Sequence, residues 1–117
     1  MTIFPMRRWL PVLLVALVPV VGHAAGDAEA GKAKAVEKTC NTCHGDNGIS
    51  VASTFPNLAG QYADYLENAL KQYASGKRKN AIMAQFATGL SPQDMKDLAA
   101  WYSSQAGLGT VPKTAAD

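Results

Sequence analysis

The order of apolar and polar positions divides the chain into one long apolar run, followed by segments in which apolar residues recur with a helical period. Residues 9–21 are almost entirely apolar. Residues 61–75 and 91–102 instead carry apolar side chains at steps of three and four, which is typical of helices with one buried face. These positions are Tyr62, Leu66, Ala69, Leu70 and Tyr73 in the first segment, and Met95, Leu98, Ala99 and Tyr102 in the second. The pattern therefore predicts two amphipathic helices.

Local residues indicate where these two helices begin or end. Ser91 is suited to cap a helix, Pro92 to occupy its first position and Asp94 its first turn, so the last helix should begin here. Gly76 is suited to end the helix over residues 61–75. The intervening stretch 80–89 is expected to be irregular.

An earlier helix is expected over residues 27–38, because this segment is rich in alanine and has acidic residues near its start. Gly31 lies inside it, where glycine costs about 1 kcal/mol against alanine. It is either a tolerated surface glycine or the point at which another helix approaches closely. Turn-forming residues at 45–48 should end the following short helical segment, and a loop should continue through residue 54.

The first 24 residues have the pattern of a secretory signal peptide. Two arginines precede the apolar run, and small residues follow it, which favours cleavage after Ala24 or, nearly as well, after Ala25. The alternative is an uncleaved membrane anchor. Pro11 and Pro19 interrupt the run, which is also shorter than the roughly 20 apolar residues of a membrane span. The sequence thus predicts export to the periplasm without a stable membrane span after cleavage.

Removing 24 residues from the 117 leaves 93, enough for one small domain over residues 25–107 and a mobile tail over 108–117. The precursor has 11 basic and 9 acidic residues. Two arginines leave with the signal peptide, so the remaining chain is formally neutral and has no basic excess that would indicate nucleic-acid binding. A chain this short has a marginal core, and a large apolar cofactor would strengthen it.

The strongest chemical pattern is Cys40-Asn41-Thr42-Cys43-His44, since C-x-x-C-H is the pattern of covalent c-type haem attachment. Two thiols three residues apart lie on one helical turn, where they can bond the two vinyl groups of a porphyrin while the adjoining imidazole binds its iron. His44 is the one histidine left after cleavage, which excludes a second axial histidine. The sequence predicts one covalent haem c with iron.

Two other kinds of site use cysteines at this spacing. A thioredoxin-like redox pair expects a strand-helix-strand setting and has no use for the histidine that follows. A zinc site requires four ligands, and Cys40, Cys43 and His44 leave the fourth without a Cys or His candidate. Both are weaker explanations of the pattern than haem attachment.

Two further residues are candidates for supporting contacts. Pro56 lacks an N–H donor, so the backbone near it can present a free carbonyl as the partner that a metal-bound imidazole usually needs. The alternative is an ordinary loop proline. Arg78 lies in the densest charge cluster, residues 77–79, and could contact a haem propionate. That cluster could instead be a solvated loop or a docking patch.

With its parts in this order, the chain resembles the class I cytochromes c, in particular small bacterial monohaem carriers and single halves of related two-haem proteins. The resemblance extends over the whole chain after the signal peptide. The stretches that carry it are residues 40–45, 56–61, 76–78, Met83, and 90–102. It implies an all-α fold of about four to five helices around one haem, with the first and last helices crossing at Gly31 and Trp101.

The family resemblance also implies the sixth iron ligand, which in class I cytochromes c is a methionine between the middle and last helices. Met83 stands at that place, and related sequences often have more than one methionine there. The other methionine outside the signal peptide, Met95, belongs to the apolar face of the predicted last helix. His44 and Met83 are therefore the expected metal ligands.

The function expected from the resemblance is that of a periplasmic one-electron carrier in a respiratory chain, not an enzyme, and no catalytic residue is assigned. Its partners would be redox proteins such as a terminal oxidase, a reductase or a dehydrogenase, bound by transient docking. Two alternatives stay open at this point. One is a haem enzyme or gas sensor with an open sixth site, and the other is a haem subunit of a larger respiratory complex.

Overall fold

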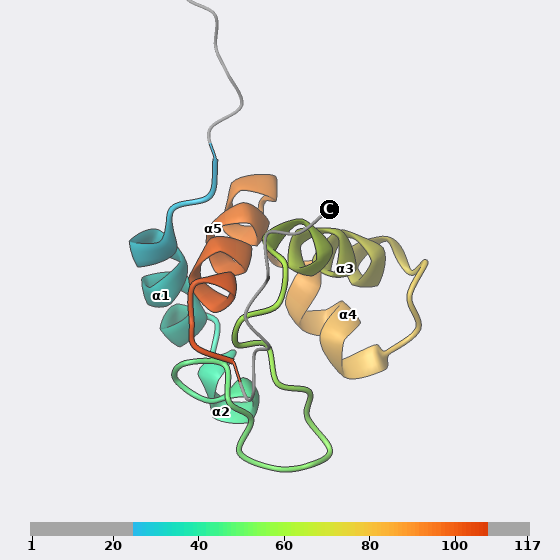
Figure 1. The fold of residues 1–117 in the computed structure, drawn as a ribbon. Helices are drawn as coiled ribbons and strands as arrows, with labels where there is room; N and C mark the ends of the chain where they lie inside the picture. Colours follow the sequence, from blue (N-terminus) through green and yellow to red (C-terminus); the bar gives the residue numbers. More distant parts are fainter. Residues whose placement is uncertain (1–24, 108–117) are drawn as a thin grey trace, which may run out of the picture.

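The computed structural model describes residues 25–107, and the regular elements in this range are all α-helices. They are α1 (Ala28–Glu37), α2 (Asn41–His44), α3 (Ala63–Ser75), α4 (Ala81–Ala87) and α5 (Pro92–Ser103), shown in Figure 1. The prediction of four to five helices and no strand is confirmed for this range. The expected signal peptide (1–24) and tail (108–117) lie outside it. Within the range, no helix has the length and apolar character needed to cross a membrane.

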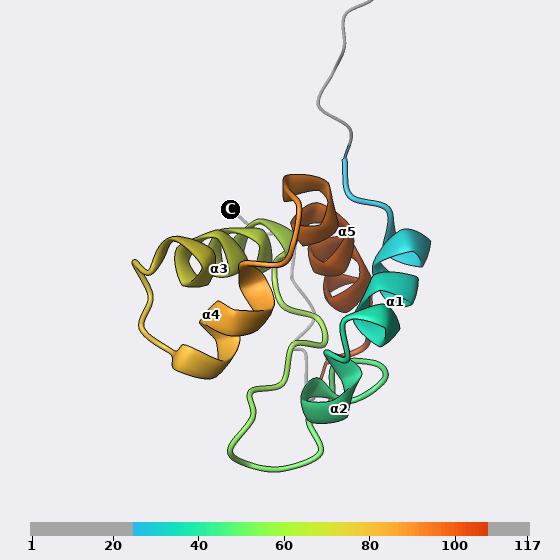
Figure 2. The same ribbon diagram turned by 180° about the vertical axis from the view of Figure 1, so that it is seen from behind.

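Helices α1 and α5 lie side by side and cross where α1 has a glycine (Figures 1 and 2). A Cβ atom on Gly31 would stand 1.9 Å from the carbonyl oxygen of Asp97 and 2.9 Å from the Cβ of Trp101. Of the two interpretations of Gly31, close helix approach is therefore the one that holds. The expected crossing at Gly31 and Trp101 is confirmed.

We expect Gly31→Ala to lower the free energy of unfolding by about 2 to 3 kcal/mol, because the added methyl group would have to separate two helix backbones. This loss exceeds the gain of about 1 kcal/mol that alanine brings to a helix. Gly89→Ala is the matched control, since its added Cβ meets nothing closer than 3.7 Å. Denaturant unfolding of the two holoproteins measures the difference. Equal stability of the two variants would contradict the close crossing.

Helix α3 packs against α5 and also against α4 (Figure 2). The stretch 80–89, expected to be irregular, contains α4 instead, so that expectation is wrong. The physical reason lies in the local sequence. The side chain of Asn80 accepts a hydrogen bond from the Met83 N–H at 3.0 Å and so caps a helix. The following residues, Ala-Ile-Met-Ala-Gln-Phe-Ala, contain several good helix formers and no breaker.

The predicted end of α3 and the predicted start of α5 are confirmed by their geometry. Ser91 Oγ accepts from the Asp94 N–H at 3.0 Å, and the Asp94 carboxylate accepts from the Ser91 N–H at 2.9 Å, which is a complete capping box. Gly76 ends α3 in the left-handed conformation with φ 76°. At the other end of the described range, the Asp27 side chain accepts from the first N–H groups of α1. These ends follow from local residue chemistry.

The buried core is small, and most of it faces one side of a cavity. Its main cluster consists of Ala35, Leu66, Leu98, Ala99 and Tyr102. All of these except Ala35 also line the cavity described below. Ala87 and Met95 are buried outside this cluster. The long loop between α2 and α3 runs beneath the helices (Figure 1) and is tied to the end of α5, where the Gly60 N–H donates to the Tyr102 carbonyl at 3.0 Å. The helices and this loop thus surround a hollow.

Candidate functional site

The two cysteines are positioned by a sharp turn at the end of α1. The Cys40 N–H donates to the Ala35 carbonyl at 2.8 Å, and the Thr39 N–H donates to the Val36 carbonyl at 3.0 Å. This pair of bonds is the Schellman ending of a helix, which places one residue in the left-handed region. Here that residue is Thr39, with φ 58°. The turn directs the chain from α1 into α2, so that the cysteines and histidine fall on one helical turn.

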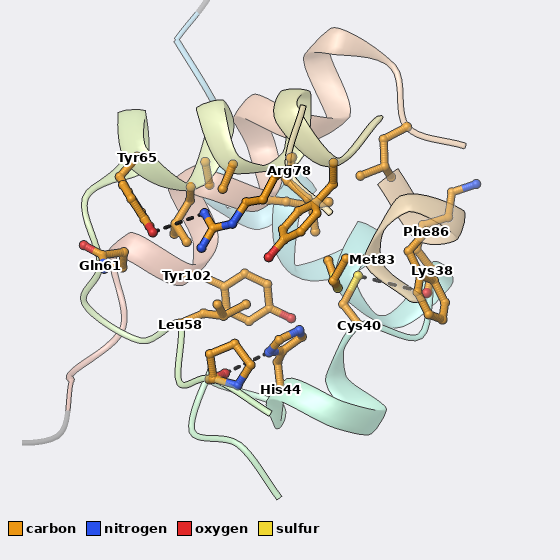
Figure 3. Close-up of a pocket in the computed structure, with 18 of the residues that line it drawn as sticks. Lys38, Cys40, His44, Leu58, Gln61, Tyr65, Arg78, Met83, Phe86 and Tyr102 are labelled. Carbon is orange, nitrogen blue, oxygen red and sulfur yellow. Dashed lines mark hydrogen bonds between the residues drawn. The ribbon is translucent and has the colours of Figure 1, made fainter. Parts of the chain in front are cut away.

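Both cysteines are free thiols, partly exposed. The Cys40 Sγ has only a long contact, 4.0 Å, with the Lys38 carbonyl oxygen (Figure 3). Burial raises the pKa of the Cys40 thiol above its ordinary value. Cys40 therefore lies in the apolar wall of the site without a strong polar partner, a setting suited to a covalent bond with an apolar group.

His44 is held in one orientation by the loop opposite it. Its side chain is buried, and its Nδ1 lies 2.9 Å from the carbonyl oxygen of Pro56. A carbonyl oxygen only accepts hydrogen bonds, so Nδ1 donates to it, and in the neutral imidazole Nε2 then carries the free lone pair. Figure 3 shows the second ring nitrogen on the cavity side of the ring. The Asn57 side chain next to Pro56 accepts from the Ser50 N–H at 2.7 Å, which fixes this part of the loop.

A cavity of about 200 Å³ lies above His44, and a second of about 140 Å³ adjoins it. The two share Cys40, His44, Pro56, Met83 and Phe86 in their walls, so they form one continuous hollow. Its upper wall is the apolar core described above, and its other side is α4. The hollow is therefore mainly apolar, with the His44 imidazole of α2 and the Met83 thioether of α4 in its walls.

The two methionines of the described range have different surroundings. Met83 is the third residue of α4 and lines both cavities, whereas Met95 is buried at 6% exposure in α5 and lines neither. The expectation that Met95 belongs to the core is confirmed. Met83 owes its place to α4, and not to an irregular backbone as expected from the sequence. Met83 is therefore the methionine whose side chain lines the α4 side of the hollow, opposite α2.

Arg78 lies at the edge of the same cavity between two tyrosine rings. Its guanidinium centre is 5.9 Å from the ring centre of Tyr65 and 5.1 Å from that of Tyr73, and its Nη1 donates to the Tyr65 hydroxyl at 3.2 Å (Figure 3). This contact with Tyr65 raises the pKa of Arg78 above its ordinary value. The sequence analysis assigned no such role to the two tyrosines. Their spacing of eight residues on one helix face was the available signal.

The residues of this hollow fit a haem. Two free thiols and an oriented imidazole come from one helical turn, a thioether faces them, and the walls are apolar. The Tyr102 hydroxyl is buried in the wall without a hydrogen-bond partner. The alternatives fit less well. No strand adjoins the cysteines in residues 25–107, as a thioredoxin-like pair requires, and no cluster of three or more Cys, His, Asp or Glu side chains suits a metal ion there.

Comparison with known proteins agrees with this site. The Cytochrome c family profile matches residues 28–106. Cytochrome c-554(548) of Halomonas halodenitrificans is 50% identical over 84 residues, which cover 69% of this chain and 99% of that protein. Cytochrome c4 of Pseudomonas aeruginosa is 46% identical over 98 residues, which cover 80% of this chain and 48% of that protein.

The fold agrees as well. The crystal structure of reduced recombinant cytochrome c4 from Pseudomonas stutzeri superimposes with a TM-score of 0.66 at 42% identity, over 72% of this chain and 48% of that one. The chain thus spans about half the length of these cytochrome c4 relatives. Together with the C-x-x-C-H turn formed by Cys40, Cys43 and His44 and the apolar hollow above it, these matches show that the chain belongs to the class I cytochrome c family, whose members bind haem c covalently.

Proposed function

We propose that the protein is a periplasmic one-electron carrier whose haem iron is held by His44 and Met83. An electron-transfer role is that of the family. The observation that carries the finer proposal is the placement of both side chains, from α2 and α4, in the walls of the same hollow. The haem supplies the reversible exchange of one electron between ferric and ferrous iron. Export is supported by the signal-peptide pattern of residues 1–24.

The chain's contribution is to fix the ligands and keep water away from them. The Pro56 carbonyl holds the Nδ1 hydrogen of His44, which orients the ring and makes Nε2 a better donor to iron. The Asn80 cap fixes the start of α4 and with it the backbone of Met83. Two pre-positioned ligands leave no site for a substrate and require little movement on oxidation or reduction, which suits a carrier.

Arg78 is proposed to bind a haem propionate. Its guanidinium donates a hydrogen bond to the Tyr65 hydroxyl and has several other N–H groups at the cavity edge. The rings of Tyr65 and Tyr73 hold it by cation-π contact, and no carboxylate among residues 25–107 forms an ion pair with it. An anionic group at the cavity edge would complete this arrangement.

The partners are proposed to be redox proteins of a respiratory chain, bound transiently. A relative from Thiomonas intermedia, 36% identical over 84% of this chain and 46% of that protein, is named a thiosulfate dehydrogenase electron acceptor. A dehydrogenase as donor is therefore one class of partner to test, beside a terminal oxidase or a reductase. Small redox interfaces are weak, which allows a carrier to leave after transfer.

Voltammetry of the purified holoprotein tests the proposal. A carrier should give a single reversible one-electron wave that is unchanged by oxygen, nitrite or hydrogen peroxide. The reason is that both axial positions are occupied and no substrate reaches the iron. A catalytic current with any of these three would favour a haem enzyme with an open sixth site and would reject the carrier.

Lys77 and Lys79 are exposed and flank Arg78, so they should attract anionic reactants to this edge of the hollow. We expect the double change Lys77→Glu and Lys79→Glu to slow oxidation of the reduced protein by ferricyanide several-fold at low ionic strength, with the difference lost in high salt. Stopped-flow absorbance measures the second-order rate. The control is the double variant Lys32→Glu and Lys96→Glu, which makes the same change in net charge on α1 and α5, away from the 77–79 cluster. Equal slowing in both double variants would exclude the 77–79 cluster as the docking site.

A further inference from the structure

The hydroxyl group of Tyr102 is a buried donor without an acceptor. Tyr102 lies on the inner face of α5 at 3% exposure, and its hydroxyl oxygen has no hydrogen-bond partner within the described residues. Figure 3 shows this hydroxyl inside the cavity, on the side where His44 and Cys40 lie. Burying a hydroxyl without a hydrogen-bond partner destabilises a fold, so an acceptor is expected in the working protein.

The ring cannot turn easily to find that acceptor elsewhere. A Cβ on Gly48 would stand 2.9 Å from the Tyr102 Cδ1 atom, so the ring rests directly on the Gly48 backbone. The Tyr102 carbonyl is also fixed by the Gly60 N–H at 3.0 Å. Burial raises the pKa of Tyr102 far above its ordinary value, and the Cys40 sulfur and the Asp46 carboxylate raise it further. The hydroxyl therefore keeps its hydrogen and remains a donor.

The chemistry of haem attachment supplies an acceptor in the same cavity. Cys40 lines that cavity and packs against the core cluster that contains Tyr102. When its thiol adds to a vinyl group, the sulfur bonds to the vinyl carbon next to the porphyrin ring and the thiol hydrogen passes to the terminal vinyl carbon. The Cys40 sulfur then has no hydrogen to donate to the Lys38 carbonyl and retains lone pairs that can accept.

We propose that the Tyr102 hydroxyl donates a hydrogen bond to the thioether sulfur of Cys40 once haem is attached. Tyr102 is then a positioning residue that holds the attached edge of the haem against α5. The bond withdraws electron density from the sulfur, which favours the reduced iron and raises the reduction potential. This inference rests on covalent attachment at Cys40 and does not depend on the identity of the sixth ligand.

The test compares the parent holoprotein with Tyr102→Phe, which removes the hydroxyl and keeps the ring. Resonance Raman spectra of the parent should show a C–S stretching band that shifts in D₂O. The reason is that the Tyr102 hydroxyl, the proposed hydrogen-bond donor, exchanges its hydrogen for deuterium. The shift should be absent in Tyr102→Phe and also in Cys40→Ala, which keeps the Cys43 link. The reduction potential should be lower in Tyr102→Phe than in the parent. Tyr62→Phe, on the exposed start of α3, should change neither quantity.

The outcomes separate this inference from the proposed function. A parent C–S band that is insensitive to D₂O overturns it even if Tyr102→Phe fails to fold. A band that still shifts in D₂O in Tyr102→Phe also overturns it, since the donor is then a buried water or another group. Intact mass shows independently whether one haem is covalently bound, so a failure of attachment would be recognised as such.

Discussion

A chain in which Cys40 and Cys43 are both replaced by alanine is expected to be largely unfolded. Without its thiols the chain cannot retain haem covalently, and the apolar walls of the hollow would face water. Four of the five residues in the main core cluster line that hollow, so this cluster has little apolar packing of its own. Almost the whole free energy of unfolding should be lost, leaving a value near zero.

Far-UV circular dichroism and thermal melting of this double variant measure the effect. The holoprotein with both cysteines, at the same concentration and pH, is the control. We expect a weak helix signal and no cooperative transition in the variant. A native-like helix signal with a cooperative melt would show that the helices and their loop can close around the hollow without the cofactor.

The replacement Met83→Ala is expected to remove the sixth ligand. The ferric protein should lose its weak red-region charge-transfer band of sulfur ligation, and the reduction potential should fall, because a thioether stabilises ferrous iron. The fall should be on the order of 0.1 V or more, a fraction of the roughly 0.8 V range that axial ligands span. Optical spectra and redox titration measure the two effects.

Met95→Leu is the matched control, because Met95 is buried in α5 and lines neither cavity. It should keep the band and the potential, with a loss of stability below about 1.5 kcal/mol for a similar-sized apolar residue. Loss of the band in Met95→Leu with its retention in Met83→Ala would contradict the assignment of Met83.

The structural features that depend only on residues close together in the sequence could be predicted from the sequence. The capping residues around Ser91 set the start of α5, Gly76 set the end of α3, and the C-x-x-C-H pattern set the turn that carries the haem bonds. The close approach at Gly31 was one of two explanations of a glycine inside a helix. Residue spacing alone could not decide between them, since the decision depends on α5, some 65 residues further along.

The features that were missed depend on weak local signals or on contacts between distant segments. Helix α4 is only seven residues long, too short for a clear apolar period, and its cap is a single asparagine. The Arg78 contacts join a loop to one face of α3, and the isolation of the Tyr102 hydroxyl depends on what surrounds it in the fold. No pattern in a single sequence shows that a buried hydroxyl lacks a partner.

The central claim is that the iron has two protein ligands and no open position, and carbon monoxide tests it most directly. The reduced holoprotein at neutral pH should keep its visible spectrum unchanged under carbon monoxide, because His44 and Met83 occupy both axial positions. A prompt shift of the Soret band to that of a carbon monoxide complex would show an open or readily vacated sixth site and would contradict the account.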